Sequence, residues 1–216
     1  MAPDPIALNE GESLVVAPIL SKPLHVRIAR HISNILSPMA VSLPFIFLVA
    51  FYHANNLFAA VGYACMTLFF LSAGPMLYIL HGVRTGKFTD VDVSVRAQRT
   101  GPFFFGLTSA LIGLLVLALT GGPRILQTVL LASILTGILY MAITLKWKIS
   151  IHASSLAGAL TMLTALYGTV VLPAFSLVVL VSWSRVVLRR HTLTQVIAGS
   201  LVSMALASLV LALRGV

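Results

Sequence analysis

Long stretches of uncharged, apolar residues are the feature that most restricts how this chain can fold. Seven such stretches lie at about 35–54, 57–80, 102–120, 125–145, 153–168, 170–188 and 196–213. Most are close to the roughly 20 residues that an α-helix needs to cross the hydrocarbon core of a bilayer. Because unpaired backbone groups are costly in lipid, such crossings must be helical. The sequence therefore predicts an all-α, polytopic membrane helix bundle.

The number of crossings depends on how the stretch 153–188 is divided. It is too long for one ordinary span, and Gly168 and Pro173 favour a tight reversal between two shorter helices. Seven spans then fit the chain, with six as the alternative. Residues 1–34 contain acids and prolines and no apolar segment typical of a signal peptide. We expect 1–34 to be a polar N-terminal tail and 35–216 a single transmembrane domain.

Composition excludes the soluble classes of protein. Hydrophobic residues make up 59% of the chain and charged residues only 9%, whereas ordinary soluble domains carry about 25% charged residues. A single core of this size cannot hide so much apolar surface. The formal net charge of +9 therefore favours contact with a lipid bilayer or a phosphate group over nucleic acid. The oligomeric state is left open.

The basic residues are distributed unevenly between the two predicted faces. With seven spans, Arg124 and Arg214 lie on one face and the other 12 of the 14 lysines and arginines lie on the opposite face. These twelve are Lys22, Arg27, Arg30, Arg84, Lys87, Arg96, Arg99, Lys146, Lys148, Arg185, Arg189 and Arg190. The positive-inside rule then predicts a cytoplasmic N-terminus and a cytoplasmic basic face, in a bacterial-type inner membrane or a plasma membrane.

None of the predicted spans contains an acidic residue. The five acids lie in the tail and at Asp90 and Asp92. Enzymes that hold a divalent cation beside a lipid diphosphate need several carboxylates, and proton-coupled transporters usually carry a carboxylate within the membrane. We therefore expect chemistry based on His, Arg and Lys, with no metal and no cofactor.

Three polar segments on the basic face carry such residues: 87–102, 146–154 and 184–195. An even number of predicted spans separates each segment from the next, so all three can meet at one membrane surface. Arginine binds phosphate oxygens through paired, planar donors. One histidine can attack phosphorus while another protonates the leaving oxygen. The pattern is typical of a phosphate site.

These segments resemble the motifs of the type 2 phosphatidic acid phosphatases, a family related to vanadium haloperoxidases and glucose-6-phosphatase. The family pattern is Lys-x6-Arg-Pro, then Pro-Ser-Gly-His, then Ser-Arg-x5-His-x3-Asp. The third motif is matched by Ser184-Arg185, His191 and Gln195, and the second by Ser150 and His152. The first motif is matched loosely. The resemblance covers roughly residues 85–200.

The resemblance implies a metal-independent hydrolase. His191 would be the nucleophile that forms a phosphohistidine, His152 the general acid, and Gln195 the residue that orients His191. Phosphate oxygens would be bound by Arg185, Arg99 and Ser150. Further candidate phosphate ligands at this face are Arg96, Lys87 and Lys148.

Three positions depart from the family pattern. Gln195 replaces the aspartate, Asp92 stands seven residues before Arg99 where a lysine is expected, and Ile149 and Ile151 replace the proline and glycine. Two functions therefore remain. One is a phosphatase acting on a monoester or diphosphate such as phosphatidic acid or a prenyl phosphate. The other is a weakened or inactive relative that binds or transports lipid.

Overall fold

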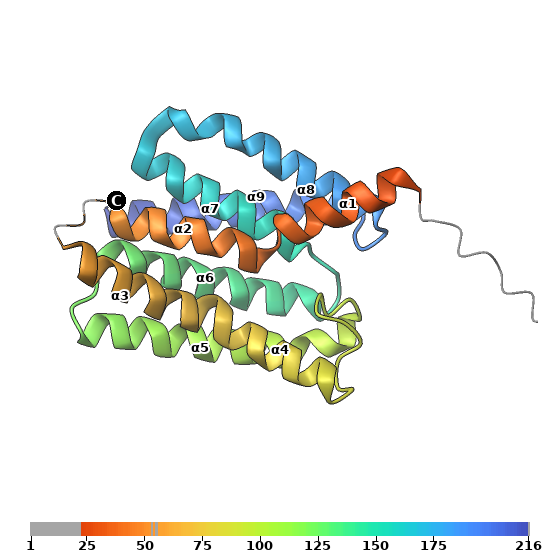
Figure 1. Cartoon of the computed structure of the whole chain (residues 1–216), viewed down its shortest axis with the longest axis horizontal. Coiled ribbons are helices and arrows are strands. Elements are labelled where there is room, and N and C mark those ends of the chain that lie inside the picture. The colour runs from red at the N-terminus through yellow and green to blue at the C-terminus, as the bar shows by residue number, and fades with distance from the viewer. Residues whose placement is uncertain (1–22, 53, 55, 216) are drawn as a thin grey trace, which may run out of the picture.

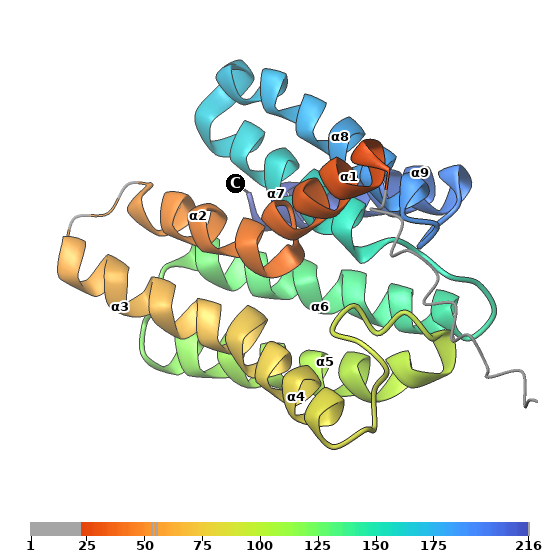
Figure 2. The same cartoon turned by 45° about the vertical axis from the view of Figure 1, so that its right-hand side comes forward.

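The computed structural model describes residues 23–52, 54 and 56–215, which form an all-α bundle without β-strands in those ranges. Figures 1 and 2 show the long helices running side by side, with the first helix extending beyond one end. The α-helices are α1 (Leu24–Ile35), α2 (Pro38–Phe51), α3 (Leu57–Leu68), α4 (Gly74–Arg84), α5 (Thr100–Leu119), α6 (Arg124–Thr144), α7 (Ile151–Tyr167), α8 (Ser176–Val187) and α9 (Leu193–Arg214).

Three short helical segments join some of these helices. The π-helix η1 (Phe69–Ala73) connects α3 to α4, and the 3₁₀-helices η2 (Arg96–Arg99) and η3 (Gly168–Phe175) precede α5 and α8. The π-turn lies just before Pro75, which has no N–H to donate to an α-helical bond. A wider turn at this point lets α3 and α4 continue as one long segment.

Six helical segments in the described part of the chain are long and apolar enough to cross a membrane. They are Leu24–Phe51, Leu57–Arg84, Arg96–Leu119, Arg124–Thr144, Ile151–Val187 and Leu193–Arg214. The prediction of a polytopic all-α bundle is therefore confirmed.

The fifth segment reverses direction within its length. Gly168 has φ +75°, a conformation open to glycine at little cost, and α8 returns beside α7 (Figure 1, cyan to blue). The side chains of His152 and Arg185, near the two ends of the segment, both reach Asp92. The predicted reversal is present, and the segment makes two passes of the bundle.

The start of the chain differs from the predicted tail. Residues 24–34, assigned above to a polar tail, belong to helix α1. The helix is amphipathic: Leu24 and Ile28 lie on one exposed apolar face, whereas Ala29 and Ser33 are buried, and α1 packs on α8. In the sequence, basic residues stand between the apolar residues of α1. The helix therefore contains no continuous apolar run from which it could be predicted. Residues 1–22 lie outside the described part.

Helix α7 lies in the centre of the bundle and positions the site. It packs against α2, α8 and α9, and small residues let α9 approach closely. A Cβ added at Gly158 would lie 2.4 Å from the Ser203 hydroxyl, and that hydroxyl donates to the carbonyl of Ser154 at 2.8 Å. This contact fixes α7 and α9 in register.

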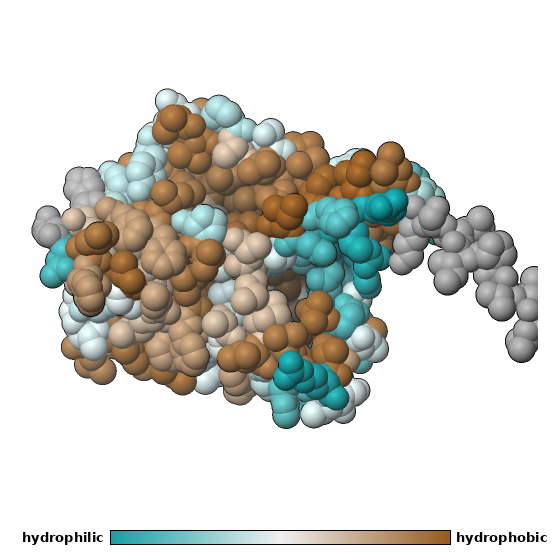
Figure 3. All heavy atoms as spheres, viewed as in Figure 1, coloured by the Kyte–Doolittle hydropathy of each residue, from teal (hydrophilic) through white to brown (hydrophobic). Residues whose placement is uncertain are grey.

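Polar residues gather at one end of the bundle, which we call the polar end. It consists of the loops 85–99, 145–150 and 188–192 together with α1. In Figure 3 hydrophilic surface gathers at this end, whereas hydrophobic surface covers much of the helices. Arg214 lies at the opposite end, where it donates to Thr128 at 3.4 Å. The basic loops are thus separated from Arg124 and Arg214 as the sequence predicts, and Lys22 is outside the described residues.

Candidate functional site

The three polar segments meet at the polar end. Arg99 of the first segment donates to the carbonyl of Ile149 in the second at 3.2 Å. The amide of Ser150 donates to the carbonyl of Gln195 in the third at 3.4 Å. Arg185 of the third pairs with Asp92 of the first. The convergence predicted from the sequence is therefore observed.

The nucleophile predicted from the resemblance, His191, lies in the short loop between α8 and α9 and is buried. Its Nδ1 is 3.1 Å from Oε1 of Gln195. The same oxygen accepts from the amide of Thr192 at 3.2 Å, so the orientation of the Gln195 side chain is fixed by a backbone donor. An oxygen can only accept, so Nδ1 of His191 carries the proton. The lone pair of the neutral ring is thereby placed on Nε2.

His191 is held in its neutral form. Burial lowers the pKa of His191 to about 3, and the charges of Arg185 and Arg99 act in the same direction, against a smaller opposing effect of Gln195. The imidazole is therefore neutral at physiological pH and presents an unprotonated Nε2. Gln195, which replaces the aspartate of the family pattern, supplies orientation and tautomer control without a charge.

Arg99, His152, Arg185 and His191 form a buried cluster at the polar end. Asp92 contacts this cluster, a role that the sequence analysis did not give it. Its Oδ2 accepts from Nη1 of Arg185 at 3.0 Å, and its Oδ1 is 3.9 Å from Nε2 of His152. Burial raises the pKa of Asp92, but the charges of Arg185, His152 and Arg190 outweigh burial and leave that pKa below its ordinary value. Asp92 is therefore a carboxylate at neutral pH. The sequence indicated a role for Asp92 through its position seven residues before Arg99, where the family pattern has a lysine.

Arg185 is almost completely buried, with 2% of its surface exposed. Its Nη1 donates to the Ser33 hydroxyl at 2.7 Å as well as to Asp92. Its Nε has no hydrogen-bond partner among the described residues. A buried donor without an acceptor is costly, so this guanidinium is poised to bind an acceptor such as a phosphate oxygen.

Arg99 holds the first and second segments together. Its Nε donates to the carbonyl of Val93 at 3.0 Å and its Nη1 to the carbonyl of Ile149 at 3.2 Å. Ile149 stands where the family pattern has a proline, and here it supplies a carbonyl to this buried arginine. Arg99 also lines the large cavity described below.

Ser150 and His152 begin helix α7. Ser150 is the N-cap and its hydroxyl accepts from the amide of Ala153 at 3.5 Å, while His152 lies in the first turn and is buried. Tyr140 of α6 fixes the next turn: its hydroxyl is 2.5 Å from that of Ser154 and donates to the carbonyl of Gly199 at 2.7 Å. These hydrogen bonds fix the first turns of α7 and thereby the position of His152.

The other candidate phosphate ligands are placed differently. Arg96 is exposed and donates to the carbonyls of Thr144 and Leu145 at the end of α6. Lys87 is exposed and lies 5.8 Å from the ring centroid of Tyr78. Lys148 is half-buried, and burial together with the charges of Arg99, Arg190 and Arg185 lowers its pKa. Lys148 thus lies within the electrostatic field of these arginines.

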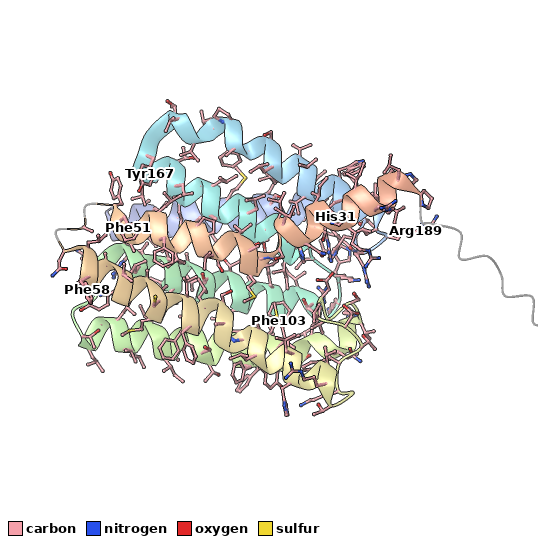
Figure 4. The ribbon with its side chains drawn as sticks, viewed as in Figure 1. His31, Phe51, Phe58, Phe103, Tyr167 and Arg189 are labelled. Carbon is pink, nitrogen blue, oxygen red and sulfur yellow. The ribbon has the colours of Figure 1, made fainter. Side chains whose placement is uncertain are left out.

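A cavity of about 730 Å³ ends at the cluster. Arg99, His152, Arg185 and His191 line its polar end, and apolar side chains of α2, α4, α5, α6 and α7 line the rest. Phe103, labelled in Figure 4, contributes to this wall from α5, whereas Tyr167 and Phe58 lie at the opposite end of the bundle. Volume and lining are suited to an apolar chain with a polar head.

Gly199 is the point at which α9 touches the start of α7, and it offers a test of the site's architecture. A Cβ there would lie 2.9 Å from the carbonyl oxygen of Ser150, a backbone atom that cannot move without shifting the His152 turn. We expect Gly199→Ala to destabilise the protein by about 1–3 kcal/mol. Gly62→Ala is the matched control, because no atom lies within 4 Å of its added Cβ. The midpoint of thermal unfolding should be lower for Gly199→Ala than for Gly62→Ala. Equal midpoints would contradict the close contact between Gly199 and Ser150.

Comparison with known proteins found no matching family model, curated protein or solved structure. The geometry itself therefore carries the functional argument. Among the described residues, no three His, Cys, Asp or Glu side chains are grouped so that they could hold one metal ion.

Proposed function

We propose that the protein is an integral membrane lipid-phosphate phosphatase that works through a phosphohistidine. The observation that carries the proposal is the cavity of about 730 Å³, which is lined mainly by apolar side chains with some hydroxyl groups between them and ends at two buried histidines and two buried arginines. An amphiphile with a phosphate head and an apolar tail matches both parts. Phosphatidic acid and prenyl phosphates or diphosphates are the classes of substrate that fit.

In the first step, Nε2 of His191 attacks phosphorus and the bond from phosphorus to the lipid oxygen breaks. Protonated His152 donates its proton to that oxygen, and the lipid alcohol leaves. The carboxylate of Asp92 lies 3.9 Å from Nε2 of His152. The otherwise unpartnered Nε of Arg185 donates to a phosphoryl oxygen, and fixed donors of this kind stabilise the developing charge.

In the second step, neutral His152 accepts a proton from water as the water oxygen attacks phosphorus. The bond between phosphorus and His191 breaks, inorganic phosphate leaves, and His191 returns to its neutral form. The reaction consumes one water and needs no metal ion or cofactor. With the basic loops placed by the positive-inside rule, the polar end faces the cytoplasm and the substrate comes from the cytoplasmic leaflet.

The activity test is phosphate release from purified protein in the presence of a chelator of divalent cations. We expect phosphatidic acid or a prenyl phosphate to be hydrolysed at the same rate with and without the chelator, because His and Arg perform each step. A protein that releases phosphate from none of these lipids, with its fold intact by circular dichroism, would contradict the proposal. Loss of activity on chelation would contradict the metal-independent mechanism.

The second candidate function is lipid binding or transport without hydrolysis. The contact between Gln195 and His191 (3.1 Å) favours it, because a neutral amide cannot balance the positive charge that the ring gains when it bonds to phosphorus. Co-purification of a phosphorylated lipid that stays intact on prolonged incubation would support this alternative. Hydrolysis of the co-purified lipid to free alcohol and phosphate would support the phosphatase function.

A further inference from the structure

A second, smaller cavity of about 210 Å³ lies at the polar end, between α1 and the loop that follows α8. It is polar, and it differs from the large cavity in containing neither histidine of the site. Its lining residues are Arg30, Ser33, Asn34, Asp92, Arg185, Leu188, Arg189 and Arg190. Ser33, Asn34, Asp92 and Arg185 also line the large cavity. The two cavities thus meet at the pair formed by Asp92 and Arg185.

The charges around this cavity are not balanced. Four arginines line it against the single carboxylate of Asp92, which is paired with Arg185. Arg190 bonds the Ser94 hydroxyl and lies 4.0 Å from Asp90. The side chains of Arg30 and Arg189 have no hydrogen-bond or ion-pair partner among the described residues. Two free guanidinium groups beside a buried third favour a bound anion.

The arginines of the cavity come from two parts of the chain, helix α1 and the region where α8 ends. Arg30 comes from α1, Arg185 from the end of α8, and Arg189 from the turn beyond it, where its backbone has φ +53°. Figure 4 labels Arg189 and His31 at this end of the bundle. Several guanidinium groups that line one cavity are suited to a tetrahedral anion with several oxygens.

Helix α1, which lines the cavity, is amphipathic. Leu24, Ile28 and Ile35 form an exposed apolar face on α1, whereas Arg30 lies on a different side of the same helix. An amphipathic helix of this kind lies in the membrane interface with its apolar face toward the acyl chains. An interfacial position of α1 would place the cavity next to Arg30 at the level of the lipid head groups.

We propose that this cavity is a second phosphate-binding site, adjacent to but separate from the site that contains His152 and His191. Two sources supply such a group here: the head group of an anionic phospholipid and free inorganic phosphate. Recognition relies in both cases on the same donors, of which Arg30 and Arg189 are specific to this cavity. The proposal concerns binding, and it holds whether or not the neighbouring site hydrolyses lipids.

The test compares the full chain with Arg30→Gln/Arg189→Gln in nanodiscs of phosphatidylcholine. Thermal unfolding is followed as inorganic phosphate is added against chloride at equal ionic strength, and separately as phosphatidylglycerol, a phosphodiester, replaces part of the lipid. A ligand that binds the folded state raises the midpoint with its concentration. We expect at least one of the two ligands to raise the midpoint of the parent, and the double variant to need about ten times more of that ligand for the same shift.

The matched control is Arg27→Gln/Arg84→Gln, which removes two exposed arginines from the polar end without touching the cavity. It should respond as the parent does. A double variant at Arg30 and Arg189 that responds like the parent to both ligands would overturn the proposal, as would an equal loss in the control, which would indicate general electrostatics. Stabilisation by phosphatidylglycerol alone would identify the lipid source, and stabilisation by phosphate alone the free anion. Failure of lipid hydrolysis would leave these results unaffected.

Discussion

Replacing His191 by alanine is expected to reduce phosphate release at least about a thousandfold, because the variant lacks the atom that bonds to phosphorus. Nε2 of His191 is the unprotonated nitrogen of a buried, neutral ring whose other nitrogen is held by Gln195 at 3.1 Å. No other described side chain has this combination. The measurement is the initial rate on a lipid phosphate for parent and variant at matched protein amounts.

His152→Ala provides the informative comparison, since the two histidines have different tasks. A general acid matters for an alkyl alcohol, which is a poor leaving group, and matters little for an acidic phenol. We therefore expect His152→Ala to lose about a hundredfold or more on alkyl phosphates and to recover most of the first-step rate on an aryl phosphate. His191→Ala should be inactive on both substrates. Undiminished release by His191→Ala would exclude the phosphohistidine mechanism.

Trapping of the intermediate gives an independent readout. A phosphohistidine contains a P–N bond, which is labile in acid and stable in base, so radiolabelled phosphate on the protein should show that stability. His152→Ala should accumulate the labelled form with an aryl substrate, because the second step loses its base. Label that persists in His191→Ala would place the phosphate on another residue.

The sequence predicted those parts of the molecule that depend on local pattern. Apolar runs identified the helices from α2 onward, because a helix that is to cross lipid must be apolar over most of its length. The reversal at Gly168 was visible because its φ of +75° is a conformation that favours glycine. The spacing of Arg185, His191 and Gln195 placed these residues around the short connection between α8 and α9.

The features that were missed depend on tertiary packing. Helix α1 has charges on one side and lies against α8, so its apolar residues never form a continuous run. Asp92 belongs to an irregular loop, and its contact with Arg185 joins residues far apart in sequence. The sequence analysis considered Asp92 only together with Asp90, as a pair of carboxylates that is too small to hold a metal ion. Neither its burial nor its partners follow from a periodic pattern.

Asp92 also explains how a buried arginine cluster stays stable without substrate. An unpaired charge in the interior is strongly unfavourable, and removal of one partner of such a pair costs about 3–5 kcal/mol. The carboxylate of Asp92 balances Arg185 at 3.0 Å and lies between the two cavities. In the proposed reaction a phosphate oxygen takes the free Nε of Arg185, so the ion pair and the substrate use different donors of one guanidinium.

Narrowing the large cavity is expected to change the tail-length preference of the proposed phosphatase. Ala132 of α6 lines the cavity, about 12 Å along the helix axis from Tyr140 at eight residues of roughly 1.5 Å each. Phenylalanine at position 132 would exclude roughly four methylene groups of a bound tail, each contributing about 0.8 kcal/mol of burial. The resulting loss of about 3 kcal/mol corresponds to about a hundredfold lower kcat/KM for long-tailed substrates.

Short-tailed lipid phosphates separate this effect from damage to the fold. A tail that ends before Ala132 loses no contact in Ala132→Phe, so its kcat/KM should stay within about twofold of the parent. Ala118→Phe is the matched control, because Ala118 is exposed on α5 and does not line the cavity; it should alter neither substrate. A selective loss for long tails would show that the tail occupies this cavity while its phosphate lies at His191. Equal losses for short and long tails would place the tail outside the cavity, against the lipid-facing surface of the bundle.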